Sequence, residues 1–441
     1  MSPKDTAAGV AGTGGSIPVL ERYDALVMDL DGVVYRGDRV VPGAAAALPE
    51  VRRRGVPVVF LTNNSARTPQ EVAARLVGMG IQATPDEILT SALATATMLR
   101  GQPFDGSRPD PTAPRAPTTA FVIGEQGVRE ALTQAGVDIV DGEPDRTDLV
   151  VVGWDRHADY DRLRTASLLV QRGARLVATN PDASYPAPDG LWPGAGALLA
   201  VVTTTTGATP TVVGKPNVPM FEAAAAMSAA RRPLMVGDRL DTDIAGASAA
   251  GWDSMLVLTG ASRTQELPMP SATSLPTYLG ADLGAVLDDR IPARPRPCSG
   301  RDLPAVRALL EATALPPDDA GERTEGTIVI EIDGDPPGSI AATARLTAVD
   351  GHPYLRSVAV TQEARGQGLG LLVAAAALRQ APGGDARTPP TYLLTEGGEG
   401  FFRRLGFVPV ARSDLPDPIA ATARDQGCGT SATAMVLAPG G

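Results

Sequence analysis

The sequence is poor in cysteine and lysine, and it contains no long apolar run. Its two cysteines, Cys298 and Cys428, are too few for a disulfide framework or a cysteine-based zinc site, so we expect ordinary thiols. No stretch of about 18 consecutive apolar residues occurs, which excludes a membrane-spanning helix. Residues 1–22 lack the continuous apolar segment of a signal peptide. We therefore predict a disordered tail at residues 1–22 of a cytoplasmic protein.

The chain is also short of positive charge. It has 39 basic and 50 acidic residues and a formal net charge of −11, which argues against a nucleic-acid partner. A small phosphorylated metabolite remains compatible, because one local cation or metal ion can overrule the global field. Lysine occurs only at Lys4 and Lys215, whereas arginine is common. Lys215 is therefore a candidate for a role that arginine cannot fill.

With 441 residues, the chain is long enough for at least two domains. From Tyr23 onward, short apolar runs alternate with helix-like stretches, which predicts parallel βα units. A proline-rich stretch at residues 292–297 marks a domain boundary, and the five prolines of residues 101–117 predict a loop. The predicted strands are Ala25–Met28, Val56–Leu61, Ala120–Ile123, Leu149–Val152, Arg175–Ala178, Thr211–Val213, Leu234–Val236 and Ser254–Leu258.

Several of these strands end in polar residues, and ligands bind at the carboxyl ends of strands in open α/β sheets. The first strand leads into Asp29-Leu30-Asp31-Gly32. Two aspartates one residue apart at a strand end point the same way and repel each other unless a cation lies between them. Mg²⁺ fits this arrangement, because it prefers hard oxygen ligands and keeps waters that a phosphate can displace.

Three further clusters follow other predicted strands. They are Thr62-Asn63-Asn64-Ser65, Lys215 after Gly214, and Asp238 in the segment Gly237-Asp238-Arg239-Leu240-Asp241-Thr242-Asp243. Taken singly, each has an ordinary structural interpretation, namely a helix N-cap, a solvated amine and a turn. Together they supply hydroxyl and amide groups, a cation and a third carboxylate. This combination predicts a phosphate-processing site.

These clusters resemble the four motifs of the haloacid dehalogenase superfamily, in the subfamily that contains the p-nitrophenyl phosphatases and the glycerol-phosphate and phosphoglycolate phosphatases. The resemblance extends to Val177-Ala178-Thr179-Asn180-Pro181-Asp182 and Pro193-Gly194-Ala195-Gly196-Ala197. It implies an α/β fold with a Rossmann-like core, here residues 23–84 and 206–288. It also implies an α/β cap domain, here residues 85–205, inserted between the second and third motifs.

The resemblance implies a mechanism that the chemistry of the residues supports. Asp29 would attack phosphorus and form an aspartyl-phosphate, and Asp31 would act as general acid and then general base. Mg²⁺ would be held by Asp29, Asp238 and the backbone carbonyl of Asp31, while Asp243 would orient Lys215 or a metal-bound water. The residues expected to hold the phosphoryl oxygens are Thr62, Asn63, Asn64 and Lys215.

The cap is expected to choose the substrate. In the resembled family, the positions of Trp154 and Tyr185 face the leaving group, so both are candidate substrate-binding residues. The alternative for Trp154 is an ordinary core aromatic residue. Ala66 stands where some relatives carry a basic residue, which leaves recognition of a second anionic group open. Small polyol phosphates fit best.

Residues 292–441 contain Ser357-Val358-Ala359-Val360 followed by Arg365-Gly366-Gln367-Gly368-Leu369-Gly370 at the start of an apolar helix. Backbone N–H groups at such a loop can bind a pyrophosphate. With Phe401-Phe402-Arg403-Arg404-Leu405-Gly406-Phe407, this region resembles the GNAT acetyltransferases and an α+β fold. The resemblance implies acetyl-CoA binding by Val358, Val360, Arg365, Gly366, Gly368 and Gly370. Phe402 stands where many such enzymes have a tyrosine acid.

We therefore predict a Mg²⁺-dependent phosphatase that acts through an aspartyl-phosphate and carries a GNAT-like domain. The order of the two domains is similar to that of a group of glycerol 3-phosphate phosphatases, so glycerol 3-phosphate is the favoured substrate. Phosphoglycolate or another small phosphate ester is the alternative. The C-terminal domain is either an acetyl-CoA sensor or an N-acetyltransferase. A homodimer is left open.

Overall fold

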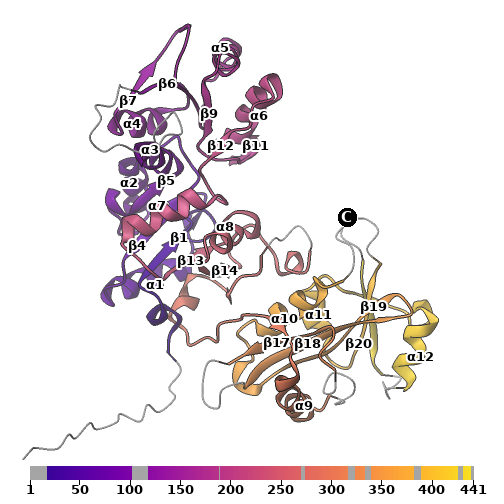
Figure 1. Cartoon of the computed structure of the whole chain (residues 1–441). Helices are drawn as coiled ribbons and strands as arrows, with labels where there is room; N and C mark the ends of the chain where they lie inside the picture. Colours follow the sequence, from indigo (N-terminus) through magenta and orange to yellow (C-terminus); the bar gives the residue numbers. More distant parts are fainter. Residues whose placement is uncertain are drawn as a thin grey trace, which may run out of the picture. The chain divides into compact units, whose positions relative to one another are not determined.

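The computed structural model describes residues 17–101, 118–187, 189–269, 274–315, 323–332, 339–381, 389–425 and 431–438. The chain divides into two compact units (Figure 1). One unit consists of Tyr23–Arg263 and Ser271–Ala285, and the other of Met1–Arg22, Thr264–Pro270 and Val286–Gly441. Apart from Gly101, the predicted proline-rich loop lies outside the described residues, as does Cys428.

The core of the first unit is a six-stranded sheet in the order β15-β14-β13-β1-β4-β5, and each neighbouring pair is parallel. β1, β4 and β13 are buried along their whole length. This explains their continuous apolar runs, because a parallel sheet is covered on both faces. The strands are β1 (Ala25–Met28), β4 (Val58–Thr62), β5 (Ile88–Thr90), β13 (Pro233–Gly237), β14 (Asp253–Val257) and β15 (Tyr278–Gly280). The helices are α1 (Pro42–Arg53), α2 (Pro69–Gly78), α7 (Val218–Ser228) and α8 (Ala245–Ala249).

The cap has its own parallel sheet, in the order β12-β9-β8-β6-β7. Along β6, Ala120 and Val122 pack into a cluster shared with the core, whereas Phe121 and Ile123 pack on the opposite side. The alternation follows from the two-residue period of a strand. α5 and α6 lie side by side (Figure 1). The elements are β6 (Thr118–Ile123), β7 (Val137–Val140), β8 (Leu149–Val152), β9 (Arg175–Ala178), β12 (Thr211–Val212), α3 (Ser91–Gly101), α4 (Gln126–Gln134), α5 (Tyr160–Gln171) and α6 (Ala195–Thr206).

Two small hairpins complete the first unit. The first, β2 (Tyr35–Arg36) with β3 (Arg39–Val40), follows the Asp29-Leu30-Asp31-Gly32 segment. The second, β10 (Ser184–Ala187) with β11 (Gly190–Pro193), follows β9 in the cap. Each hairpin carries side chains that line the cavity described below.

The domain borders differ from the predicted ones. β5, within the predicted cap range of residues 85–205, pairs with β4 in the core sheet. β12, within the predicted core range of residues 206–288, pairs with β9 in the cap sheet. Short runs such as Ile88–Thr90 can join either sheet, because strand pairing is a tertiary property that apolar patterning does not specify.

Part of the predicted disordered tail is ordered. Val19 and Leu20 are fully buried in a short 3-10 helix, Val19–Arg22. The Val19 N–H donates to the Asp288 carbonyl at 3.1 Å, and Pro18 forms a bridge with Asp289. In the sequence, the apolar pair Val19-Leu20 is too short to predict a helix. The structure shows that both side chains are buried in one.

The second unit contains a seven-stranded sheet in the order β16-β17-β18-β19-β20-β22-β21. β19 and β20 are parallel and meet at a single residue pair, Tyr354 and Tyr392, so they separate beyond it. The strands are β16 (Arg296–Pro297), β17 (Thr327–Glu331), β18 (Ile340–Val349), β19 (His352–Val360), β20 (Thr391–Thr395), β21 (Val408–Val410) and β22 (Thr433–Leu437). The helices are α9 (Leu303–Ala312), α10 (Leu369–Leu378), α11 (Glu399–Arg403) and α12 (Asp417–Asp425).

The longest of the described helices, α1, α5 and α6, have 12 residues each. A bilayer span needs about 20. Within the described residues, no helix has the length and apolar character needed to cross a membrane.

Candidate active site

Three of the predicted site residues follow strands that are neighbours in the core sheet. Asp29 follows β1, Thr62 ends β4, and Asp238 follows β13. The Asp29 N–H donates to the Val236 carbonyl at 2.9 Å, which ties the end of β1 to β13. Because neighbouring parallel strands end at the same edge of a sheet, their terminal side chains converge there.

Lys215 lies on the chain segment that returns from the cap to the core, and its side chain is buried between two carboxylates. Its exposure is 3%. Nζ lies 2.5 Å from Oδ1 of Asp29 and 2.7 Å from Oδ1 of Asp243. It also donates to the Leu61 carbonyl at 3.3 Å. The three ammonium donors thus face three oxygen acceptors, a compact arrangement that a wide, planar guanidinium would not fit.

The same burial shifts the pKa values of this cluster. Burial raises the pKa of Asp29 to about 8. The charge of Lys215 lowers this pKa, whereas the charges of Asp243 and Asp238 raise it. Burial and the charge of Asp243 raise the pKa of Asp238 to about 7. Burial would lower the pKa of Lys215, but Asp243 and Asp29 outweigh it and raise that pKa above its ordinary value. The cluster therefore has an excess of negative charge that a further cation would relieve.

The residues present fit a hard divalent cation. Among the described residues, Asp29, Asp238 and Asp243 offer carboxylate oxygens within 4.8 Å of one another. Asp243 is already engaged, because Oδ1 faces Lys215 and Oδ2 accepts the N–H groups of Asp238 and Arg239 at 3.2 and 3.1 Å. Oδ2 of Asp238 accepts the Ala261 N–H at 2.6 Å, whereas its Oδ1 is buried without a hydrogen-bond partner in the described part of the chain. An unpartnered buried carboxylate oxygen beside Asp29 suits a metal ligand.

Two glycines allow the carboxylates to approach this closely. Gly32 has a φ of +87°, and a Cβ there would lie 2.5 Å from Oδ2 of Asp238. At Gly260, a Cβ would lie 1.9 Å from the same oxygen. Gly32 belongs to the motif noted in the sequence, but Gly260 and Ala261 do not, and the sequence analysis missed them. Their only signal is their position in the short segment after β14, three and four residues beyond its end at Val257.

Asn63, which we expect to hold phosphoryl oxygens, lines the cavity. The polar atoms of its side chain also form hydrogen bonds within the protein. Nδ2 donates to Oδ2 of Asp182 at 3.1 Å and to the Lys215 carbonyl at 3.0 Å, and Oδ1 accepts the Lys215 N–H at 2.9 Å. Asn63 therefore ties the cap loop between β9 and β10 to the segment that returns from the cap to the core.

Thr62 and Asn64 are arranged differently from Asn63. The Thr62 hydroxyl oxygen accepts the Asn64 N–H at 3.1 Å, so its own O–H can still donate to a ligand. Oδ1 of Asn64 accepts the Ala66 N–H at 3.0 Å, which leaves the amide N–H₂ available. Both residues line the cavity.

A cavity of about 360 Å³ opens between the carboxylate cluster and the cap. Asp31 lines this cavity from the core side. Partial burial raises the pKa of its carboxyl, whereas the charges of Arg75 and Arg36 lower it. The size suits a small metabolite, since binding pockets typically start at about 300 Å³.

Trp154 and Tyr185 form the cap wall of this cavity. Their rings stack with centroids 4.1 Å apart and an interplanar angle of 28°. The indole Nε1–H donates to the Pro193 carbonyl at 3.0 Å, which anchors the indole ring to the β10–β11 hairpin. Both side chains line the cavity, so Trp154 is not simply a core aromatic residue.

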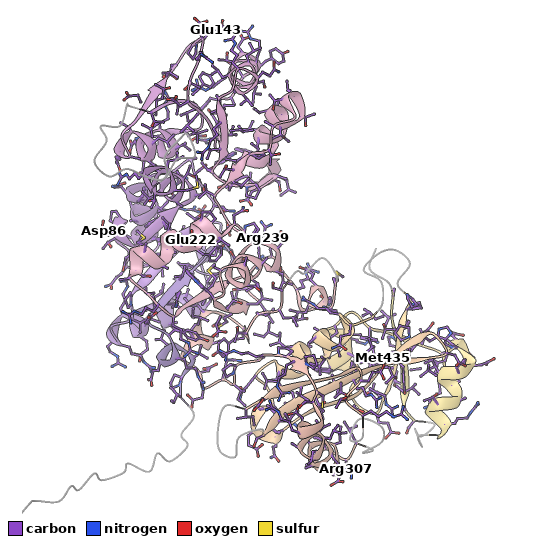
Figure 2. The ribbon with its side chains drawn as sticks, in the orientation of Figure 1. Asp86, Glu143, Glu222, Arg239, Arg307 and Met435 are labelled. Carbon is purple, nitrogen blue, oxygen red and sulfur yellow. The ribbon has the colours of Figure 1, made fainter. Side chains whose placement is uncertain are left out.

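The cavity is also lined by four charged residues that the sequence analysis did not assign to the site: Arg36, Arg75, Asp182 and Arg239. Arg239, labelled in Figure 2, follows β13 and binds Asp241 through Nε and Nη2 at 3.0 and 2.7 Å. Asp182 belongs to a segment that carried the family resemblance, but its charge was not given a role. Arg36 and Arg75 had no signal in the sequence, because arginine is common in this chain.

In the second unit, β19 ends at Val360, and the predicted loop joins it to α10. Gly366 and Gly368 have φ values of +82° and +87°, and Gly368 is the N-cap of α10. Side chains at both positions would be strained. A Cβ at Gly370 would lie 3.1 Å from the Phe401 ring, so this glycine permits close packing. The backbone from Arg365 thus turns into the N-terminus of a buried helix, where the first N–H groups of a helix lack an intrahelical partner as a rule.

Comparison with protein families identifies both regions. Haloacid dehalogenase-like hydrolase models match residues 26–138 and 212–286. The model of the acetyltransferase (GNAT) family matches residues 294–407. Together these matches cover most of the core, the first part of the cap and residues 294–407 of the second unit.

Comparison with individual proteins gives the same result. The chain is 35% identical over 272 residues to an acid sugar phosphatase of Staphylococcus haemolyticus, covering 61% of this chain and 97% of the relative. It is 36% identical over 271 residues to the D-glycerol 3-phosphate phosphatase of Mycobacterium tuberculosis, covering 62% and 73%.

Among solved structures, the glycerol phosphate phosphatase of Mycobacterium tuberculosis in complex with magnesium is similar, with a TM-score of 0.66 and 28% identity. The match covers 89% of this chain and 99% of that one, so it includes the second unit. The fold class expected from the sequence is therefore confirmed. The chain belongs to the haloacid dehalogenase-like hydrolases and carries a GNAT-family domain after its hydrolase region.

Proposed function

We propose that the first unit hydrolyses the phosphate monoester of a small polyol or sugar, with glycerol 3-phosphate as the favoured substrate. The chain is a phosphatase of the same family as relatives named acid sugar phosphatase, D-glycerol 3-phosphate phosphatase and 5'-nucleotidase. The observation that carries the proposal is the buried Lys215, held between Asp29 and Asp243 beside the unpartnered oxygen of Asp238.

Asp29 acts as the nucleophile in this proposal. One of its oxygens attacks phosphorus, and the bond to the leaving oxygen breaks to give an aspartyl-phosphate. Lys215 lowers the pKa of Asp29 against the effect of burial, which increases the ionised fraction of the nucleophile, and its charge neutralises part of the phosphate charge. Thr62 and Asn64 donate to the phosphoryl oxygens. Asp243 holds the ammonium of Lys215 in place.

Asp31 handles the protons. It donates a proton to the leaving alkoxide and then takes one from the water that hydrolyses the aspartyl-phosphate. Its pKa is raised by partial desolvation, which favours the protonated form needed for the first step. Mg²⁺, held by Asp29, Asp238 and the backbone carbonyl of Asp31, would screen the carboxylates from the phosphate dianion.

The test is phosphate release from glycerol 3-phosphate, sugar phosphates, phosphoglycolate and nucleotides in the presence of Mg²⁺. Asp29→Asn keeps the shape of the nucleophile but removes its reactivity, so we expect a loss of about 1,000-fold or more. Asp161→Asn is the matched control, because Asp161 is an exposed cap residue paired with Arg164 at 3.4 Å. An Asp29→Asn protein that keeps a tenth of wild-type turnover would rule out the nucleophile assignment.

We further propose that the second unit binds acetyl-CoA at the loop of residues 365–370. The positive φ values of Gly366 and Gly368 before a buried helix support this, because they turn backbone N–H groups toward a pyrophosphate. The expected contacts are Val358, Val360, Arg365, Gly366, Gly368 and Gly370. Phe402 contacts the rings of Phe401 and Phe407 and has no hydroxyl to protonate a thiolate. This favours an acetyl-CoA sensor over an N-acetyltransferase.

Two assays on the full-length chain separate these roles. Calorimetry with acetyl-CoA tests binding, and phosphate release with and without acetyl-CoA tests coupling. Acetyl transfer to an amine would restore the bifunctional alternative. No binding at millimolar acetyl-CoA would refute the cofactor assignment. Gel filtration of the same sample tests whether the chain forms a homodimer.

A further inference from the structure

The cavity of the first unit is lined by four cationic side chains, and three of them are held by protein groups. Lys215 is paired with Asp29 and Asp243, and Arg239 is paired through two nitrogens with Asp241. The third, Arg75, belongs to α2 and is discussed next. The fourth is Arg36, which is exposed and lies on β2. Within the described part of the chain, no hydrogen bond or ion pair engages its guanidinium.

Arg75 holds the hairpin that carries Arg36. Its Nη2 donates to the Gly37 carbonyl at 2.8 Å, in the turn between β2 and β3. Its guanidinium carbon lies 4.5 Å from the centroid of the Tyr35 ring. Tyr35 is buried and immediately precedes Arg36. The cation–π contact and the hydrogen bond therefore fix the backbone from which the Arg36 side chain extends.

The hairpin lies on the side of the cavity where the leaving group must be. Asp31 forms a β-bridge with Tyr35, and the Gly32 N–H donates to the Tyr35 carbonyl at 2.7 Å. Asp31 and Arg36 both line the cavity, and the bridge to Tyr35 places the hairpin next to Asp31. In the proposed function Asp31 protonates the leaving oxygen, so the hairpin stands beside the leaving-group part of the cavity.

We propose that Arg36 binds a carboxylate on the leaving group, so that the enzyme hydrolyses phosphorylated hydroxy acids as well as polyol phosphates. A free guanidinium on a fixed hairpin can accept a carboxylate through two parallel hydrogen bonds. This inference rests on the proposed phosphatase function and names a substrate class for the same cavity. It also changes the expectation drawn from Ala66, because the cation comes from a different element.

The test uses two substrates that differ at one carbon. Glycerol 3-phosphate ends in a hydroxymethyl group where 3-phosphoglycerate carries a carboxylate. Arg36→Ala should lower kcat/KM for 3-phosphoglycerate by about tenfold to a hundredfold more than for glycerol 3-phosphate, mostly through KM, because a charge-assisted hydrogen bond is lost. Any effect of Arg36 on the protonation of Asp31 acts on both substrates and cancels in the ratio.

Arg39→Ala is the matched control. Arg39 is the register partner of Arg36 in the same hairpin and is exposed, but it does not line the cavity. Arg39→Ala removes the same charge and should leave the ratio of the kcat/KM values for the two substrates unchanged. Arg36→Lys should restore part of the wild-type ratio, because lysine keeps the charge but not the planar guanidinium. If Arg36→Ala does not fold, Arg36→Gln keeps most of the side-chain length without the charge.

The outcomes distinguish the two levels of the argument. Equal losses for both substrates in Arg36→Ala would overturn the carboxylate site. Wild-type turnover of glycerol 3-phosphate without turnover of 3-phosphoglycerate would also overturn it, while leaving the phosphatase proposal intact. Phosphate release from neither substrate nor any other ester would instead contradict the proposed function itself.

Discussion

Replacing Lys215 by methionine tests the central arrangement of the site most directly. The substitution keeps an unbranched side chain of similar length but removes the ammonium from between Asp29 and Asp243. Two buried carboxylates then lose their shared partner. Breaking a buried ion pair in this way typically costs about 3–5 kcal/mol of stability. Since the pKa of Asp29 is already about 8, protonation of this carboxyl relieves part of the strain, and we expect the lower end of that range.

Activity should fall further than stability. Without the ammonium, the pKa of Asp29 rises further above about 8, so a still smaller fraction of the nucleophile is ionised at neutral pH. That effect contributes about a tenfold loss, since one pKa unit corresponds to a factor of ten in ionisation. Loss of charge stabilisation at the phosphoryl group contributes about a further 100- to 1,000-fold. The product is a decrease in kcat/KM of about 1,000- to 10,000-fold.

The assay is phosphate release followed across pH, with thermal unfolding of the same samples. The kcat/KM profile of Lys215→Met should move to higher pH, because ionising Asp29 restores part of the activity. Lys215→Arg is the matched variant, which keeps the charge but crowds the three acceptors around Nζ. We expect it to be more stable than Lys215→Met and still poorly active. A Lys215→Met enzyme with a tenth of wild-type kcat/KM and an unmoved profile would refute the reasoning.

Further predictions concern the metal, the cap and the second unit. Without divalent cations, the raised pKa values of Asp29 and Asp238, about 8 and about 7, mean that the folded state binds more protons than the unfolded one above about pH 4. The free energy of unfolding should therefore fall as pH rises toward about 8, and Mg²⁺ should raise Tm more at about pH 8 than at about pH 5; an equal shift would contradict the carboxylate site. Trp154→Ala and Tyr185→Ala should change the ranking of substrates more than the rate with an aryl phosphate, and a uniform loss would mean that the stack is structural. Gly368→Glu should abolish acetyl-CoA binding in calorimetry, because a side chain is strained at φ +87° and the added charge repels the phosphates; wild-type affinity in this variant would exclude the loop as the site.

Much of the chemistry could be predicted from the sequence, because it lies in short local segments. Asp29 and Asp238 directly follow apolar strands, and the edge of a parallel sheet brings such residues together whatever the details of packing. The rarity of lysine singled out Lys215 without any structural information. The GNAT-like segment was recognisable because glycine spacing reports backbone conformation directly. The family and the fold class followed from these local patterns.

Other features were decided by tertiary packing. The side chain of Asn63 forms hydrogen bonds with Asp182 and Lys215, which are 119 and 152 residues away in the sequence, so no local pattern could reveal these contacts. The assignment of β5 to the core sheet and β12 to the cap sheet depends on which edge was available for pairing.

Arg36 shows the same limit most clearly. It is one of many arginines in the chain, and composition gives no reason to choose it. It becomes notable only because, among the described residues, Arg36 lines the cavity without a protein partner for its guanidinium, whereas Lys215, Arg239 and Arg75 are held by protein groups. A residue's chemistry is encoded locally, but whether that chemistry is free to act depends on its neighbours, and those neighbours are brought together only by the fold.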